Sequence, residues 1–384
     1  MKIPAKFQVI QHVRLKYGCP NKCEAPKLAP LAPQLLPRHQ VSPRLIATIV
    51  TQKFEDHLPL HRQAKIFSKR FGVKFNSTTL SDWVIKAYNI AIVPLLYLMQ
   101  SELNKSDYIQ ADETTLQVLN EKGKKAKSKS YIWVRVSNQN RKPMVLMNYY
   151  SSRAMKNANE LFEGFNKGYL QTDGYKGYND VANKKDVKQL GCWAHTRRKF
   201  TDIVKNSKVD DESNKIASNI LLKIKKLYDI ERKIKDKPPD IKKELRKKES
   251  VPMLIEIREF LDEYALKANS LGGLIKDAFT YINNQWSKLT IYCDDGRLNI
   301  DNNIAENHIR PIALGRKNWL FANSTEGAKA LCGWYSIIES AKMNNLEPFK
   351  YLDFILTEFP KLKAEKKEID VLLPWNVKMD DIEG

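Results

Sequence analysis

The chain has 384 residues, of which 42% are hydrophobic, so it can bury a substantial core in two or three domains. Lysine and arginine number 65 against 44 acidic residues, and the net charge of +21 favours a polyanionic partner, either nucleic acid or an anionic membrane. The longest apolar run, residues 90–99, falls short of the ~20 residues of a membrane-spanning helix, and residues 1–9 lack the apolar segment of a signal peptide. Five cysteines are too few, and odd in number, for a disulfide framework. The simplest class is a soluble cytoplasmic protein that acts on DNA or RNA, with no membrane partner.

The N-terminal region divides by composition. Residues 1–24 read as a short extended piece that ends in Cys19-Pro-Asn-Lys-Cys23, and a proline-rich linker follows over 25–43. Apolar residues at helical spacing predict helices over 44–104. The second helix is predicted over 60–71, and the third is predicted to begin at a cap formed by Asn76. Helix, glycine turn, polar cap and helix outline a helix-turn-helix-like DNA-binding region. An ordinary helical packing module is the alternative.

Alternating and apolar runs then predict five strands with a helix between the third and the fourth, at 108–119, 131–136, 144–150, 168–172 and 187–191. Three meandering strands followed by alternating helices and strands predict an α/β fold with a ribonuclease-H-like core. The helix between the third and fourth strands is expected over 154–165.

The second half of the chain is predicted to be helical. Residues 196–290 are highly charged, with twelve basic and five acidic side chains between Lys223 and Lys248, and Pro238-Pro239 breaks them into a helical hairpin inserted into the core. Mixed apolar helices return over 301–359, and Pro348 suits the first turn of the last one.

Three carboxylates carry the chemical signal. Asp112 falls inside the first strand, Asp173 at the end of the fourth, and Glu306 on a helix opened by Asn302-Asn303. Each alone would most simply be a solvated surface charge, but a charge flanked by apolar strand residues is costly unless it has a function. First and fourth strands lie side by side in a ribonuclease-H core, so the aspartates should meet and the late helix should bring Glu306 across. Mg²⁺ prefers carboxylate oxygens, and the three together predict metal-dependent phosphoryl transfer.

Several segments around these carboxylates resemble the transposases of the insertion-sequence-66 family: ADET at 111–114, TDGYKGY at 172–178, GCWAHTRRKF at 191–200, the long block at 301–324 and its continuation at 336–352. The resemblance runs from about Phe7 to Trp375. The family belongs to the DDE transposases, which cut and join DNA. It implies that Asp112, Asp173 and Glu306 are the catalytic metal ligands, with two Mg²⁺ or Mn²⁺ ions as cofactors.

The resemblance also implies a domain order. The core occupies 105–195 and 301–345, a helical insertion at 196–300 separates Asp173 from Glu306, and 346–384 form a C-terminal helix and tail. The implied partners are the terminal repeats of the element and target DNA, a second copy of the chain in a synaptic homo-oligomer, and accessory proteins of the same element.

Other residues near these motifs have weaker signals. Cys192 and His195 match a Cys-x-x-His element of related families, and they either order the active site or DNA end or form a buried cysteine and a capped histidine. The candidate DNA-binding residues are basic or aromatic, with a solvated basic face or core packing as alternatives: Arg197, Arg198, Arg316, Lys317 and Trp319. Arg310, on the same helical face as Glu306, is a further candidate near the site. Phe321, like Trp319, could stack on an unpaired base, and core packing is favoured for both.

The chain departs from the family at its N-terminal cysteines. Family members carry two cysteine pairs in a zinc-binding segment, whereas only Cys19 and Cys23 occur here, spaced C-x3-C in place of C-x2-C. Two cysteines cannot complete a tetrahedral site, so a structural zinc is not expected and residues 1–24 are interpreted as a remnant of that segment. Two other functions therefore stay open beside a transposase: a structure-specific nuclease on the same core, and an inactive DNA-binding remnant.

Overall fold

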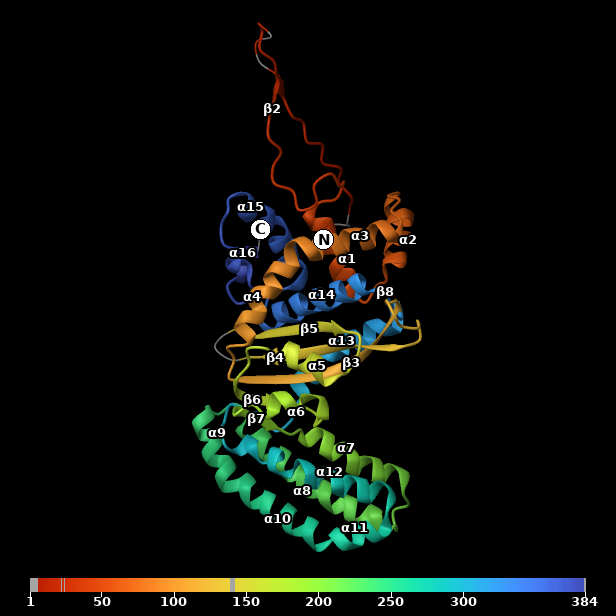
Figure 1. The fold of residues 1–384 in the computed structure, drawn as a ribbon, viewed down its shortest axis with the longest axis vertical. Helices are drawn as coiled ribbons and strands as arrows, with labels where there is room; N and C mark the ends of the chain where they lie inside the picture. Colours follow the sequence, from red (N-terminus) through yellow and green to blue (C-terminus); the bar gives the residue numbers. More distant parts are fainter. Residues whose placement is uncertain (1–5, 22, 24, 139–141, 383–384) are drawn as a thin grey trace, which may run out of the picture.

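A mixed β-sheet lies between two groups of helices in the computed structural model (Figure 1). The structure describes residues 6–21, 23, 25–138 and 142–382. The first five residues of the predicted N-terminal segment, on which the signal-peptide expectation partly rests, and the last two of the predicted tail lie outside this range. N-terminal and C-terminal helices lie together on one side of the sheet, and the green and cyan helices of the middle of the chain lie at the opposite end of the molecule (Figure 1).

The sheet has the order β5-β4-β3-β6-β7, and β8 pairs with β3 outside this path. Its strands are β3 (Tyr108–Asn120), β4 (Lys129–Ser137), β5 (Met144–Tyr150), β6 (Lys167–Gln171), β7 (Asp186–Leu190) and β8 (Ala322–Ser324). The first three pair antiparallel, whereas β6 runs parallel to both β3 and β7. The five strands expected from sequence are confirmed. The three-residue β8 was not expected, because so short a segment has no period to read.

Short helical segments precede the strands β6 and β7. They are α5 (Met155–Leu161), the 3₁₀ turn η2 (Lys176–Tyr178) and α6 (Asn179–Ala182). Helix α5 ends four residues before the predicted limit, because Gly164 takes a left-handed backbone conformation, with φ of 85°. The Trp133 ring of β4 packs edge-on against Tyr178, with ring centroids 5.4 Å apart, so this connection covers one face of the sheet.

The N-terminal region forms a hairpin and a helical group. The hairpin pairs β1 (Lys16–Tyr17) with β2 (Lys27–Leu28) and extends away from the helices (Figure 1). The helices are α1 (Pro43–Phe54), α2 (Leu60–Phe71), α3 (Ser77–Ala87), the π turn η1 (Tyr88–Ile92) and α4 (Val93–Leu103). The predicted helix over 60–71 is confirmed, and Gly72 ends it with φ of 72°. Asn76 precedes α3 as expected, but its side chain makes no capping hydrogen bond.

Helices α3 and α4 are continuous through η1. Val93 N–H donates to Tyr88 O in this wider turn, which directly precedes Pro94, a residue that has no N–H to donate. By length and composition alone the resulting helix, Ser77–Leu103, could cross a membrane, a feature that counting uninterrupted apolar residues misses. Here one stripe of the helix packs in the protein core, and the Trp334 indole donates to Val84 O at 3.2 Å.

The middle of the chain forms a helical group with its own hydrophobic core. Its helices are α7 (Trp193–Asn206), α8 (Glu212–Ile234), α9 (Pro239–Leu245), η3 (Arg246–Ser250), α10 (Val251–Glu263), α11 (Ala265–Leu271), α12 (Gly273–Leu289) and η4 (Ile291–Cys293). The expected break at Pro238-Pro239 is confirmed, between α8 and α9. Arg246 is 2% exposed; it bonds both carboxylate oxygens of Glu231 and the carbonyl oxygens of Tyr292, Asp295 and Leu298. This buried guanidinium therefore joins α8 to residues 292–298, which lead from the helical group back toward the sheet.

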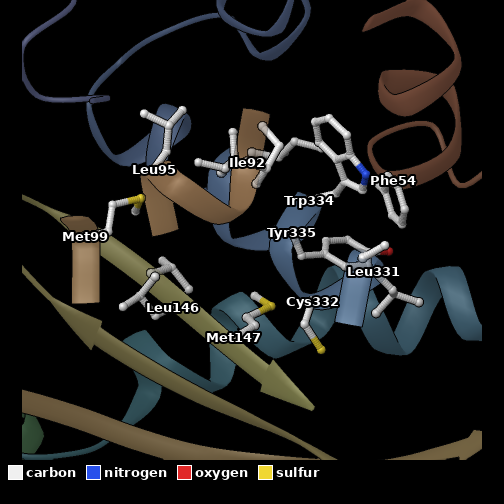
Figure 2. Close-up of a cluster of buried hydrophobic side chains, with 14 of the residues drawn as sticks. Phe54, Ile92, Leu95, Met99, Leu146, Met147, Leu331, Cys332, Trp334 and Tyr335 are labelled. Atoms are coloured by element: carbon white, nitrogen blue, oxygen red, sulfur yellow. The ribbon is translucent and has the colours of Figure 1, made fainter. Parts of the chain in front are cut away.

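The chain ends in α13 (Asn303–Trp319), α14 (Thr325–Met343), α15 (Pro348–Ala364), η5 (Asp370–Leu372) and α16 (Met379–Ile382). Pro348 opens α15, as predicted. Helix α14 is buried along most of its length, and Figure 2 shows Trp334 between Ile92 of η1 and Phe54 of α1. The Tyr335 ring packs edge-on against Phe54, with ring centroids 5.2 Å apart.

Two serines of α14 pair with the edge strand β5. Ser336 Oγ accepts from Met147 N at 2.8 Å, and Ser340 Oγ accepts from Val145 N at 2.9 Å. Four helical residues advance ~6 Å and two strand residues ~6.6 Å, so the two spacings match. Two outward N–H groups of this edge strand, those of Val145 and Met147, are therefore satisfied within the chain.

Candidate functional site

Two of the three predicted carboxylates meet between β3 and β6. Gln110 and Gln171 are register partners on these parallel strands, and Asp112 and Asp173 each follow two residues later. Ligand atoms of Asp112, Asp173 and Glu113 all lie within 4.8 Å of one another. The pairing of the first with the fourth strand therefore brings together two aspartates that are 61 residues apart in sequence.

Glu113 is an acidic member of this group that the sequence interpretation missed. Glu113 directly follows Asp112 on β3, its register partner on β4 is Trp133, and its carboxylate reaches those of Asp112 and Asp173. The Tyr178 hydroxyl donates to Glu113 Oε2 at 2.6 Å, and the Arg153 guanidinium forms an ion pair with the same carboxylate. Its position directly after Asp112 was the available signal, but a DE pair is too common to indicate a role.

Arg153 connects the two acidic strands. Besides its ion pair with Glu113, it lies 3.5 Å from Asp173 Oδ2 and stacks 3.5 Å above the centroid of the Tyr175 ring. The Tyr175 hydroxyl donates to Arg153 O at 2.6 Å, and Tyr175 N donates to Asp173 Oδ1 at 2.9 Å. The TDGYKGY segment thus contains Asp173, and its Tyr175 positions the Arg153 guanidinium that faces this aspartate.

The electrostatics of the group favour a bound cation. Burial, together with the charges of Glu113, Asp173 and Glu306, raises the pKa of Asp112 to about 8, against the lowering effect of one backbone hydrogen bond from Glu113 N. Burial, followed by the charge of Asp173, also raises the pKa of Glu113 despite its contacts with Tyr178 and Arg153. A divalent cation would reverse this effect, because carboxylate ligands stay ionised.

Glu306 lies in a neighbouring group with Cys192 and His195. Ligand atoms of these three residues also lie within 4.8 Å of one another, and Glu306 Oε1 is 3.5 Å from His195 Nδ1. Both atoms are buried, and neither has a hydrogen-bond partner among the residues that the structure describes. Burial lowers the pKa of His195, although the Glu306 charge opposes this. A neutral imidazole and a carboxylate that face each other without a shared hydrogen bond are donors that a metal ion accepts.

Cys192 orders the start of the Glu306 helix. Burial raises the pKa of its thiol to about 12, so it stays protonated, and its Sγ accepts from Asn302 N at 3.3 Å. The Asn302 side chain in turn donates to Ala111 O at 2.9 Å, directly before Asp112. Cys192 is thus a buried cysteine that also bonds the start of the Glu306 helix, so both alternatives for it stay open.

Two tyrosines of the middle helices reach the site. The Tyr281 hydroxyl of α12 donates to Asp173 O, and the Tyr228 hydroxyl of α8 donates to Asp301 Oδ2, both at 2.8 Å. Their burial in the helical group keeps both hydroxyls protonated, since it raises the pKa of each well above its usual value. The helical group therefore contacts the acidic centre as well as separating its residues in sequence.

The candidate DNA-binding residues fall into exposed and enclosed classes. Arg197, Lys317 and Arg310 are exposed, and Arg198, also exposed, lies 3.5 Å from Glu306 Oε2. Arg316 is half-buried and donates to Thr115 O and Oγ1, which joins α13 to β3.

Trp319 is only 9% exposed and packs in the hydrophobic core. The prediction that its ring stacks on a base is therefore wrong in this conformation. Core packing, the favoured alternative for this residue, describes it. Its neighbour Phe321 is 39% exposed.

The fold and the acidic centre together define an α/β protein with a net charge of +21 and a cluster of carboxylates at the end of its parallel strands. The family model for the IS66 transposase family matches residues 38–330, and that for the IS66 C-terminal element matches residues 336–375. The chain belongs to the IS66 transposase family, as its sequence motifs implied.

Three relatives from Sinorhizobium fredii (strain NBRC 101917 / NGR234) are similar along nearly the whole chain. The uncharacterized protein y4jD is 29% identical over 99% of this chain and 75% of its own length. The uncharacterized protein y4hP is 30% identical, over 98% of this chain and 69% of its own length. The uncharacterized protein y4qI is 29% identical, over 99% of this chain and 70% of its own length.

Proposed function

We propose that this protein is a DNA transposase that cleaves DNA strands and joins them to a target through Asp112, Asp173 and Glu306. The observation that carries the proposal is the meeting of Asp112 and Asp173 on adjacent parallel strands, in a chain of the IS66 family. The strand order β5-β4-β3-β6-β7, with an antiparallel half and a parallel half, supports a ribonuclease-H-like core. This core spans residues 105–195 and 301–345, with a helical insertion at 196–300.

The three carboxylates fit Mg²⁺ or Mn²⁺, since they are hard oxygen donors and the raised pKa of Asp112 favours a cation beside it. Asp112, Asp173 and Glu306 would hold the divalent metal. Bound divalent metal supplies an activated water and stabilises the leaving oxygen of a phosphodiester.

The protein's own residues orient this centre. Arg153 fixes Glu113 and faces Asp173, while Cys192 and Asn302 tie the start of the Glu306 helix to β3. Arg198, beside Glu306, is placed to contact a phosphate of the DNA.

Nucleic acid is the partner that the charge supports. The excess of 21 positive charges favours phosphate contacts, so DNA binding should weaken steeply with salt. Helices α2 and α3, with a four-residue turn after Gly72, support a helix-turn-helix-like region for the terminal repeats. Two such ends are brought together by a homo-oligomer, with accessory proteins of the same element.

The test is a strand-transfer assay with precut terminal-repeat ends, target DNA and Mn²⁺, on the wild type and Asp112→Asn. Joined products in the wild type alone support a transposase. Hydrolysis without joining favours a structure-specific nuclease. DNA binding that is equal in both proteins, with no cleavage by either, favours an inactive DNA-binding remnant.

A further inference from the structure

Each aspartate of the acidic centre is preceded, two residues earlier, by a glutamine. The sequence reads Gln110-Ala-Asp112 on β3 and Gln171-Thr-Asp173 at the end of β6, and the two glutamines are register partners. Residues two apart on a strand share a face, so Gln110 lies on the same face of β3 as Asp112, while Asp173 follows two residues after β6 ends at Gln171. Both side chains are nearly inaccessible, at 2% for Gln110 and 0% for Gln171.

The two glutamines and Tyr108 form one hydrogen-bonded network. Gln110 Nε2 lies 2.8 Å from both the Tyr108 hydroxyl and Gln171 Oε1, and the Tyr108 hydroxyl also donates to Gln171 Oε1. Burial raises the pKa of Tyr108 to about 12, so this hydroxyl keeps its proton. Buried polar groups of this kind are costly unless they are all paired, and here both amide groups are paired.

The network's remaining bonds go to the segment that leads into the Glu306 helix. Gln171 Nε2 donates to Asn299 O at 2.9 Å, and Gln110 Nε2 donates to Asp301 O at 3.2 Å. Gln110 Oε1 accepts from Ala305 N at 3.3 Å, directly before Glu306. The Tyr108 hydroxyl accepts from Asn299 N at 3.2 Å.

Gln171 reaches a second strip of backbone as well. Its Nε2 donates to Gly191 O at 3.0 Å, next to Cys192 and four residues before His195. Two amides thus connect the strands of Asp112 and Asp173 with both segments that hold Glu306 and its neighbour His195. Asp112 and Glu306 are 194 positions apart in sequence, and these amides join their backbones together with the Asn302 side chain.

We infer that Gln110 and Gln171 are positioning residues: they bind no metal, but they set the place of Glu306 relative to Asp112 and Asp173 and so govern the divalent-cation affinity of the centre. The inference rests on the proposed metal site. Loss of an outer partner of a metal ligand typically weakens metal binding by about 10–100-fold. Replacing either amide by an apolar side chain of similar length should act in this range.

The experiment measures Mn²⁺ binding by calorimetry, together with strand cleavage, for Gln110→Met, Gln171→Met and the wild type, below their unfolding temperatures. Gln63→Met is the matched control. Gln63 is also 0% exposed and donates to two backbone carbonyls, those of Ile49 and Leu58, but it lies in α2. A general cost of removing a buried glutamine would lower the unfolding temperature of all three variants.

The expected result is a Kd for Mn²⁺ raised about tenfold or more in the two site variants, with the wild-type Kd in Gln63→Met. Wild-type Kd values in both folded site variants would overturn the inference while leaving the metal site intact. If the wild type binds Mn²⁺ no more tightly than Asp112→Asn does, the proposed function is overturned, and the inference with it. Should either variant not fold, Tyr108→Phe removes one oxygen of the network, and an unchanged Kd there overturns the inference.

Discussion

His308 and Glu339 join the Glu306 helix to the most buried helix of the fold. His308 Nδ1, two residues beyond Glu306, lies 2.7 Å from Glu339 Oε2, and Glu339 is 4% exposed. Burial alone would raise the pKa of Glu339, but the contacts from His308 and Lys342 outweigh it and lower that pKa. Lys342 also bonds Glu55 of α1. One ionised carboxylate therefore connects three helices behind the acidic centre.

Glu339→Ala should lower the free energy of unfolding by ~3–5 kcal/mol, because it leaves His308 and Lys342 with a buried gap in place of their partner. Chemical denaturation measures this change. Glu358→Ala, which removes an exposed pair with Lys361, should change it by less than about 1 kcal/mol. Equal effects of the two substitutions would contradict the role given to Glu339.

The stability of the metal-free protein should fall as pH rises from about 4 to about 8. The folded protein holds a proton on Asp112 up to a pKa of about 8, whereas the unfolded chain releases it near 3.8. The stabilisation is therefore complete below the lower value and is lost as pH passes through the higher one. Thermal unfolding across this range measures the slope.

Asp112→Asn should flatten this dependence, since the amide does not titrate. Saturating Mn²⁺ should remove it from the wild type, because the cation holds the carboxylate ionised, and Mn²⁺ affinity should rise with pH over the same interval. A slope that is identical in wild type and Asp112→Asn would assign the titration to another group.

Arg153→Ala should destabilise the metal-free protein more than the Mn²⁺-bound protein. Without the guanidinium, the buried Glu113 loses an ion pair beside Asp112 and Asp173, and a bound cation offsets part of that repulsion. Thermal unfolding with and without Mn²⁺ gives the difference. Arg258→Ala, which removes an ion pair with Asp262 in the middle helices, should show the same shift under both conditions.

The double substitution Ser336→Ala and Ser340→Ala should cost about 1–3 kcal/mol for each N–H group left unpaired, those of Met147 and Val145. Chemical denaturation measures the loss. Ser270→Ala is the control, because its hydroxyl lies on the surface and contacts only Lys267 O within its own helix. A double variant as stable as this control would mean that other acceptors or waters satisfy these two N–H groups of β5.

The sequence predicts the strands well because their signal is local. Alternation in residues 108–119 and the apolar run 144–150 identify β3 and β5 to within a residue. The meeting of Asp112 with Asp173 follows once the first and fourth strands are taken as neighbours. Gly72 likewise marks the end of α2 through its own backbone preference.

Partners far apart in sequence could not be predicted in this way. The sequence suggests that Arg316 is a DNA-contacting or solvent-exposed basic residue, yet its side chain bonds Thr115, which is 201 positions away. Gln110 and Gln171 looked like ordinary polar strand residues, because their contacts at Asn299 and Asp301 come from beyond the helical group. The repeated Gln-x-Asp spacing was the only local trace of their pairing.

The segment 299–305 follows the whole middle helical group in the chain. Its position therefore determines the order in which the parts of the acidic centre are synthesised. Helices α7 to α12 make mainly contacts with one another, and helical units of this kind fold quickly from local contacts. Both aspartates and this group leave the ribosome before Glu306 does. A nascent chain therefore carries two of the three carboxylates for the time that ~130 residues take to translate, and the centre closes only when the last part of the sheet and α13 have been made.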